Sequence, residues 1–322
     1  MAKLSKRELE KKLQSGQALL IVLLGMAVVL TMVLSVVSRS VTDIQLTTRD
    51  DEALRAFSAA EAGVEQALIV GSSIGETEFA ESESSYSVNV EKLAEGQDRY
   101  EYPEEIYSGE SANLWLVSHD ENGDLSCTGA DNPCFTGTSF DVCWGSKPTD
   151  PPDNNTPAVE VSVYYDKSGD AGNNPLGINP DYGNVQVARY TYDPYSGRTS
   201  PNKFTNTGLT SDCNIDGKTF EFSANVDLSN INSVFTNTDC NSGSDGGCLL
   251  FAKAKFIYNT TPHPIGFKSS GSFPSQGVHV ESTGTFGDST RQIDVFRTYR
   301  EPLTIFESAV FSMGDDGDLT KN

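Results

Sequence analysis

The chain has 322 residues, with 45 acidic against 23 basic side chains and a formal net charge of −22. Such an acidic excess argues against direct nucleic-acid binding, which needs a basic face. The length allows one or two globular domains besides any anchor. Residues 1–12 hold five basic and two acidic side chains, so they carry +3 and the rest of the chain carries −25.

The stretch from Leu13 to Ser38 contains no Asp, Glu, Lys, Arg or His. An apolar run of about 20 residues matches the hydrocarbon core of a bilayer, which a helix crosses with its backbone groups satisfied. The run is longer than the core of a secretory signal and no Ala-x-Ala site follows it, so a retained membrane span is favoured. The basic excess before the run predicts a cytoplasmic N-terminus and an external remainder.

Apolar residues continue beyond Ser38 at helical spacing, which predicts that the same helix runs on to about Val70. Gly71 then provides a plausible stop. We expect this amphipathic half to pack on the globular part of the protein. The predicted apolar stripe consists of Val41, Ile44, Thr48, Leu54, Phe57, Ala60 or Glu61, Val64 and Leu68.

Two motifs carry a family resemblance. After the short basic leader, residues 16–24 read Gly-Gln-Ala-Leu-Leu-Ile-Val-Leu-Leu, and residues 55–64 read Arg-Ala-Phe-Ser-Ala-Ala-Glu-Ala-Gly-Val. Together they resemble the N-terminal family of PilX-type minor pilins, which belong to type IV pili. The resemblance covers about residues 13–70, and Ala-Ala-Glu-Ala-Gly is its more diagnostic half.

The resemblance implies a processing site and a set of partners. Gly16 would be the last leader residue, and Gln17 would become the N-terminus after cleavage by a prepilin peptidase. The subunit would sit in the cytoplasmic membrane, contact the pilus assembly platform and other pilins, and reach the cell surface after assembly, where it could act in adhesion. The residues expected on the packing helix of such a filament are Ile21, Gly25, Phe57, Glu61 and Gly63.

One position departs from the family pattern. Major pilins usually carry Glu at the fifth mature position, where this chain has Ile21. In the family, that carboxylate pairs with the N-terminal amine of a neighbouring subunit. Ile21 avoids an expensive buried carboxylate but leaves an incoming amine without a partner. The departure favours a minor pilin or pseudopilin, acting in initiation or at the tip, over the main filament subunit.

Beyond Gly71, short runs of alternating apolar and polar residues predict strands separated by polar turns. The expected fold is α+β: a long N-terminal transmembrane and amphipathic helix packed on a β-rich antiparallel head, pilin-like but enlarged. The predicted strands lie at 86–90, 114–117, 135–144, 159–165, 185–192, 220–228 and 249–258. The predicted segments are a leader (1–16), the helix (17–70), a head with a cysteine-bearing insertion (71–250) and an antiparallel meander (251–322). The meander comprises runs at 278–280, 293–296 and 303–311, with a turn at 287–290.

Six cysteines lie in the predicted exterior, and an even number on that side favours disulfides. Fifteen pairings are possible. We expect the two short-range pairs, Cys127–Cys134 and Cys240–Cys248, which leaves Cys143 with Cys213. A zinc site is disfavoured because the sequence has no Cys-x2-Cys pair.

One segment has the alternating oxygen side chains of a calcium loop: Asp120, Asn122 and Asp124. It lacks the glycine expected at the sixth position, which is Leu125, and a polar Asn-Gly turn is the plain alternative. No nucleophile elbow, zincin motif or phosphate loop occurs. We therefore expect a structural, non-enzymatic protein with no cofactor other than this calcium candidate. The large head leaves one alternative, a membrane-anchored extracellular binding module or enzyme unrelated to filaments.

Overall fold

The computed structural model describes residues 6–80, 82–120, 123, 125–127, 132–146, 152–166, 185–207, 213–229, 231 and 248–300, with side chains from Leu19 onward. The chain divides into two compact units, residues 1–89 with 280–294 and residues 90–279 with 295–322. The boundary expected between residues 250 and 251 instead falls inside a strand, β13 (Cys248–Ile257).

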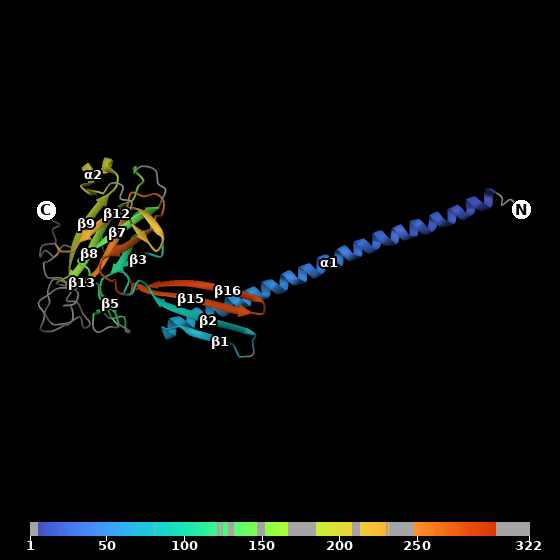
Figure 1. Cartoon of the computed structure of the whole chain (residues 1–322), viewed down its shortest axis with the longest axis horizontal. Helices are drawn as coiled ribbons and strands as arrows, with labels where there is room; N and C mark the ends of the chain where they lie inside the picture. Colours follow the sequence, from blue (N-terminus) through green and yellow to red (C-terminus); the bar gives the residue numbers. More distant parts are fainter. Residues whose placement is uncertain are drawn as a thin grey trace, which may run out of the picture. The chain divides into compact units, whose positions relative to one another are not determined.

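The first unit contains the helix α1 (Lys6–Val70), which runs for 65 residues without a break (Figure 1). At about 1.5 Å per residue it is roughly 100 Å long. It ends where predicted: Gly71 adopts a φ of +73°, and its backbone N–H donates to the Ala67 carbonyl oxygen at 2.7 Å. Glycine reaches this left-handed conformation at little steric cost, which makes it an effective helix stop.

A four-stranded sheet belongs largely to the same unit. Its order is β1 (Ile74–Glu78), β2 (Ser84–Lys92), β15 (Gly277–Phe286) and β16 (Ser289–Thr298). A two-residue turn with Gly287 at a φ of +56° joins β15 to β16, so the predicted runs at 278–280 and 293–296 and their turn are confirmed. The third predicted run, 303–311, lies outside the described residues.

The face that α1 buries against this sheet differs from the predicted stripe. Ala60 and Val64 are buried as expected, but Leu54 is 68% exposed and Phe57 is 42% exposed. The buried face is made of small residues: Ala56, Ala59, Ala60, Gly63, Val64 and Ala67. Large apolar residues dominate a periodicity pattern, whereas the sheet packs on the side where small side chains let the two backbones approach.

The second unit is a β-sandwich. One sheet has the order β10 (Thr205–Asn206), β9 (Val185–Asp193), β8 (Ala158–Asp166), β13 and β4 (Ser111–Trp115). The other has the order β11 (Asn214–Ile215), β12 (Lys218–Asp227), β7 (Ser139–Ser146), β14 (Ile265–Ser269) and β3 (Arg99–Glu101). The unit also has a small sheet, β5 (Ser118–His119) with β6 (Leu125–Ser126), and the short helix α2 (Ser196–Asn202).

One aromatic-rich core fills the space between the two five-stranded sheets. Trp144 and Phe222 contribute from one sheet and Phe256 from the other, and all three are almost completely buried. The pairings are antiparallel except that of β10 with β9, which is parallel. The α+β class with a mainly antiparallel, β-rich head is therefore confirmed.

The β4 edge of the sandwich is closed by a side chain. The backbone N–H of Trp115 donates to Gln276 Oε1 at 2.7 Å, and Gln276 Nε2 donates to the Trp115 carbonyl oxygen at 2.9 Å. Gln276 is 1% exposed. Because an open edge is a template for pairing with another chain, this amide protects part of the edge.

Candidate functional site

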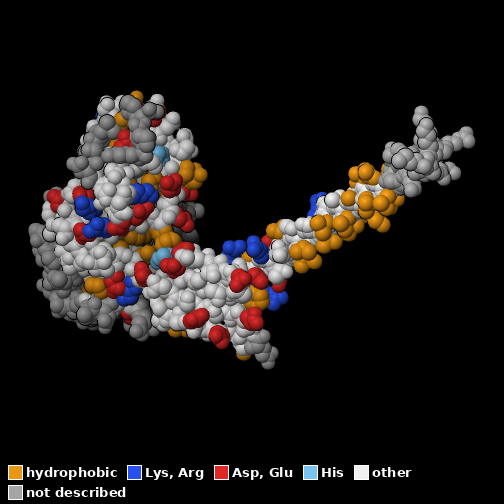
Figure 2. All heavy atoms as spheres, turned by 45° about the vertical axis from the view of Figure 1, so that its right-hand side comes forward, with side chains coloured by type: hydrophobic (Ala, Val, Ile, Leu, Met, Phe, Trp, Pro, Cys, Tyr) orange, Lys and Arg blue, Asp and Glu red, His pale blue; other side chains and the backbone are white. Residues whose placement is uncertain are grey.

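The first candidate site is the apolar part of α1. Between Leu19 and Val37 the large side chains are exposed, with Ile21 at 68% (Figure 2). This part of the chain is long and apolar enough to cross a membrane. No atom lies within 4 Å of where a Cβ on Gly25 would be, so this position is open to close approach. Gly16 and Gln17 lie within α1, but the structure describes nothing of their surroundings.

The Ala-Ala-Glu-Ala-Gly motif forms the joint between α1 and its sheet. A Cβ added to Gly63 would lie 2.9 Å from Tyr86 Cδ2 and still closer to Ser282 Oγ, so only glycine fits. Ser282 Oγ donates to the Ala60 carbonyl oxygen at 2.8 Å. Glu61, in the middle of the motif, is exposed. The motif therefore provides a small-residue contact face on one side of the helix and a charge on the other.

Two disulfides lie in the second unit: Cys127–Cys134, which closes a short loop, and Cys143–Cys213, which joins β7 to the residue before β11. Both pairs are confirmed. Cys248 is also disulfide-bonded, and its predicted partner, Cys240, lies outside the described residues. Within the described part of the chain no cysteine is free, which fits an oxidising exterior.

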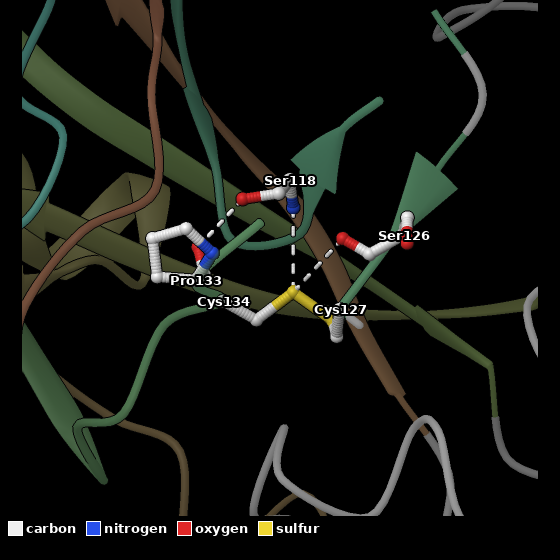
Figure 3. Close-up of a disulfide and its surroundings, with 5 residues drawn as sticks. All are labelled: Ser118, Ser126, Cys127, Pro133 and Cys134. Atoms are coloured by element: carbon white, nitrogen blue, oxygen red, sulfur yellow. Dashed lines mark hydrogen bonds between the residues drawn. A yellow bond between two sulfur atoms is a disulfide. The ribbon is translucent and has the colours of Figure 1, made fainter. Parts of the chain in front are cut away.

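The Cys127–Cys134 loop is tied to the strand β5 (Figure 3). The backbone N–H of Ser118 donates to Cys134 Sγ at 3.3 Å, and Ser118 Oγ donates to the Pro133 carbonyl oxygen at 2.6 Å. Sγ of Cys134 also lies 3.5 Å from the Ser126 carbonyl oxygen. These contacts hold the disulfide against the short β5–β6 sheet.

An aromatic cluster lies beside this loop. The ring of His119 stacks on Tyr299 with centroids 3.9 Å apart and meets Trp115 edge-on at 4.4 Å. Burial lowers the pKa of His119 to about 4, although the nearby Asp120 carboxylate opposes the shift. His119 is therefore neutral at physiological pH and serves as a packing ring.

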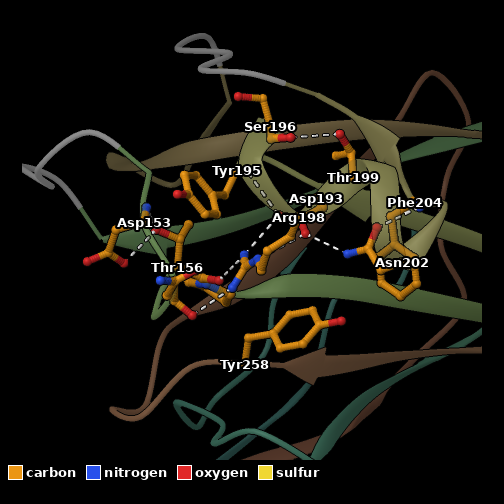
Figure 4. A network of polar contacts seen from close by, with 12 residues as sticks. Asp153, Thr156, Asp193, Tyr195, Ser196, Arg198, Thr199, Asn202, Phe204 and Tyr258 are labelled. Atoms are coloured by element: carbon orange, nitrogen blue, oxygen red, sulfur yellow. Dashed lines mark hydrogen bonds and ion pairs between the residues drawn. The ribbon is translucent and has the colours of Figure 1, made fainter.

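A charged network lies at the end of β9 (Figure 4). Asp193 is completely buried, and its carboxylate accepts hydrogen bonds from Arg198 Nε at 3.1 Å and Nη2 at 2.8 Å. Arg198 also donates to the backbone carbonyl oxygens of Asn154 and Thr156, both at 2.7 Å. The pair thus ties α2 and the end of β9 to the turn before β8.

Aromatic rings cover the same guanidinium group. Arg198 Cζ lies 4.3 Å from the ring centroid of Tyr258 and 5.3 Å from that of Tyr195. Asp193 accepts two further hydrogen bonds, from Asn202 Nδ2 and the Tyr195 backbone N–H. These partners use most of the hydrogen-bond donors and acceptors of the Asp193–Arg198 pair. The network therefore stabilises the fold and has little capacity to bind a ligand. No local sequence signal pointed to it.

The calcium candidate is only partly described. Asp120 is described, whereas Asn122 and Asp124 lie outside the described residues. The Gly123 backbone N–H donates to the Asp120 carbonyl oxygen at 2.9 Å, which closes a turn at this point. Among the described residues, no group of three or more His, Cys, Asp or Glu side chains is arranged to hold a metal ion. Calcium binding here stays a prediction.

Two parts of the structure thus have a clear physical role, the exposed apolar part of α1 and the cross-linked sandwich. The helix α1 carries the processing and packing residues expected from the sequence. Its Ala-Ala-Glu-Ala-Gly motif contacts the sheet, which explains why this part of the helix has few large side chains. No family model, no curated protein and no solved structure matches the chain.

Proposed function

We propose that the chain is a minor pilin or pseudopilin, a non-enzymatic structural subunit. It would initiate the assembly of a type IV pilus or a related filament, or form its tip. The observation that carries this proposal is the unbroken helix α1. Its apolar part is exposed between residues 19 and 37, and its last turns are seated on a sheet of the same unit. Such a helix can exchange a bilayer for a bundle of like helices, because both surroundings are apolar.

The proposed location follows from the flanks of the helix and from the disulfides. The basic leader keeps the N-terminus in the cytoplasm, and the cross-linked sandwich lies outside the membrane. Prepilin peptidase cleaves between Gly16 and Gln17, and the assembly platform then transfers the subunit to other pilins at the cell surface. The open surroundings of Gly25 support close helix approach within such a filament.

The mature N-terminus gives the most direct test. The subunit is purified from its native membrane, and its first residues are determined by Edman sequencing or by mass spectrometry of the N-terminal peptide. We expect Gln17 at the start. A chain that still starts at Met1, or that is cut after Ser38, contradicts the proposal.

The minor role is tested at Ile21, which is the fifth residue counted from Gln17. We expect Ile21→Glu to insert into the membrane but to disturb the order of assembly, since it supplies a carboxylate that can capture a neighbour's amine. Leu20→Glu is the matched control, because it adds the same charge to the same apolar surface one residue away. Filament number and subunit composition are counted by electron microscopy and mass spectrometry. Equal effects of the two variants, or no effect of Ile21→Glu, argue against a special role for this position.

One observation favours the second candidate, a membrane-anchored extracellular binding module or enzyme. The second unit has its own core and its own disulfides, as an independent module would. Replacing residues 17–38 by an unrelated membrane span separates the two candidates. Filament loss with a folded head supports the pilin proposal, whereas full retention of function supports the module.

A further inference from the structure

A buried lysine and a buried asparagine face each other on two neighbouring strands of the sandwich. Lys253 on β13 stands directly opposite Asn113 on β4 in the antiparallel register. Lys253 is 3% exposed and Asn113 is 4% exposed. Directly opposite residues in antiparallel strands project from the same face, with Cβ atoms about 4.5–5.5 Å apart. The lysine side chain is long enough for its Nζ to reach the carboxamide carbon, Cγ, of the asparagine.

The pair lies on the outer face of its sheet, beside a line of aromatic rings. Neighbours along the two strands, such as Ala112 and Ala254, belong to the core between the two five-stranded sheets. Because side chains alternate along a strand, Asn113 and Lys253 project away from that core. Trp115, Phe251 and Tyr164 form the next line on the same outer face. The ring centroid of Phe251 lies 5.2 Å from that of Trp115 and 4.4 Å from that of Tyr164. The burial and the neighbouring rings together keep water away from the pair.

The polar groups of this pair are costly to bury. Within the part of the chain that the structure describes, neither Oδ1 nor Nδ2 of Asn113 has a hydrogen-bond partner. An unsatisfied buried amide costs free energy, and a buried cation costs free energy even when it is paired. A secondary amide formed from the two side chains would carry one N–H donor and no charge, where the separate groups carry five N–H donors and one positive charge. Joining the two side chains would therefore lower the cost of burial.

We propose that Lys253 and Asn113 form an intramolecular isopeptide bond, which joins β13 covalently to β4. Nζ of Lys253 attacks Cγ of Asn113, the bond between Cγ and Nδ2 breaks, and Nδ2 leaves as ammonia. Counted from the protonated lysine, one ammonium group and one carboxamide give one secondary amide and one ammonium ion, so atoms and charge balance. Nothing is oxidised or reduced, and the reaction needs no other reactant.

The register also provides a carboxylate that can move the proton. Glu160 on β8 stands opposite Lys255, which makes it a diagonal neighbour of Lys253 on the same outer face. Diagonal neighbours have Cβ atoms about 7–8 Å apart, a separation that two long side chains can bridge. The Glu160 carboxylate takes a proton from Nζ, which frees the amine to attack, and then gives this proton to the leaving Nδ2. It thus acts first as a general base and then as a general acid.

The bond would fasten one end of its sheet. The strand β4 stands last in the order of its five-stranded sheet, next to β13. An end strand is held by a neighbour on one side only, so a covalent link to that neighbour opposes its detachment. Thiols open disulfides but leave an amide intact, so this link would persist under reducing conditions. The proposal is independent of the pilin proposal, because it concerns the second unit alone.

Peptide mapping of the purified full-length protein tests the bond. The protein is reduced and alkylated, so that no disulfide joins its peptides, and is then digested with trypsin. We expect the peptide that contains Asn113 to be joined to the peptide that contains Lys253, at their combined mass less one ammonia. Trypsin does not cut after an acylated lysine, so cleavage after Lys253 should be absent, and cleavage after Lys255 is the internal control. Two separate peptides of full mass, with cleavage after Lys253, overturn the proposal.

Variants identify the two ends of the bond. Asn113→Ala and Lys253→Arg should each abolish the joined peptide, whereas Lys255→Arg, the matched control on the same strand, should retain it. A joined peptide that persists in Asn113→Ala shows that Lys253 reacts with another residue, which overturns the assignment. The wild-type map decides the proposal by itself where a variant does not fold.

The role of Glu160 is tested by the rate of linkage. Newly made protein is sampled over time, and the fraction of joined peptide is measured by mass spectrometry. We expect Glu160→Gln to slow linkage on the order of 100-fold, because it removes the proton acceptor and keeps the size of the side chain. A rate equal to that of the wild type overturns this role.

Discussion

The two units hold together in opposite ways. In the first, α1 meets its sheet through alanines and glycines, and Gly284 on β15 lies directly against the backbone of Ala56 and Ala60. In the second, large aromatic side chains fill the space between two sheets, and disulfides and a buried ion pair fasten the loops. The first unit is stabilised by small side chains that let the helix and the sheet approach closely. The second unit is stabilised by large side chains and by cross-links.

This difference predicts how the stability of each unit responds to mutation. Where a helix and a sheet approach closely through their backbones, an added methyl group has no space and destabilises the contact. A core made of large side chains and cross-links is damaged by removing groups, because a cavity or an unpaired charge remains. Additions should therefore break the first unit, and deletions should break the second.

The largest deletion effect is expected at the buried ion pair. Asp193→Ala leaves the Arg198 guanidinium, whose side chain is 11% exposed, without its carboxylate, and should cost about 3–5 kcal/mol of the second unit's unfolding free energy. Urea unfolding followed by tryptophan fluorescence measures it. Asp98→Ala, which removes the carboxylate of the exposed Arg99–Asp98 pair, is the matched control and should change the unfolding free energy far less, because exposed ion pairs contribute little to stability. Equal costs for the two variants contradict the prediction.

The two described disulfides should differ in value because they close loops of different length. Cys143 and Cys213 are 70 residues apart, and Cys127 and Cys134 are 7 apart. In the chain-entropy model, losing the first costs about 4 kcal/mol and losing the second about 2 kcal/mol. Denaturation of the paired Cys→Ala variants measures both. Thiol titration of the unfolded, unreduced protein is the control, and six free thiols would refute the disulfide framework.

The addition experiment is Gly284→Ala. The new Cβ would clash with the Ala56 carbonyl oxygen and the Ala60 amide nitrogen, which are backbone atoms that cannot rotate away. We expect about 1–3 kcal/mol of destabilisation, confined to the first unit. Gly75→Ala on β1 is the matched control, since no atom lies within 4 Å of its Cβ position. Backbone hydrogen exchange of β15 and of the last turns of α1 reports the effect. Similar exchange rates in the two variants would contradict the close-packing argument.

The sequence predicted those features that leave a local pattern. The alternation of Tyr86 and Val88 predicted β2, Gly287 predicted the last hairpin, and Gly71 predicted the end of α1. Several short elements left too little pattern, among them β1, β14 and α2. The strands β1 and β14 have five residues each, and α2 has seven and contains Pro201, so periodicity cannot distinguish them from loops.

The prediction of the contact face of α1 was wrong for a different reason. Leu54 and Phe57 dominate an apolar pattern, but Ala59 and Gly63, which make the contact, contribute little to it. The Arg198 network could not be predicted because its partners, Asn154 and Thr156, lie more than 40 residues away in the sequence. Apolar periodicity reports how much surface a helix can bury, and tertiary geometry decides which side is used.

The smallest expected effect concerns pH and the protonation of a buried ring in the second unit. The pKa of His119 is lowered to about 4 by burial, below its usual value of 6.5. Between these values the unfolded chain binds a proton that the folded chain excludes, so the contribution of neutral His119 to stability is complete above about pH 6.5 and declines as the pH falls towards 4.

His119→Phe keeps a ring between Trp115 and Tyr299 and removes the titration. We expect the melting temperature of the second unit to fall less between pH 7 and pH 4.5 in this variant than in the wild type. His279→Phe is the control, since it replaces another imidazole stacked on an aromatic ring, that of Phe296. Carboxylates titrate in the same range in all three proteins, so the difference between the curves is the relevant quantity. Parallel loss of stability in the wild type and His119→Phe would show that protonation of this buried ring does not act on the fold.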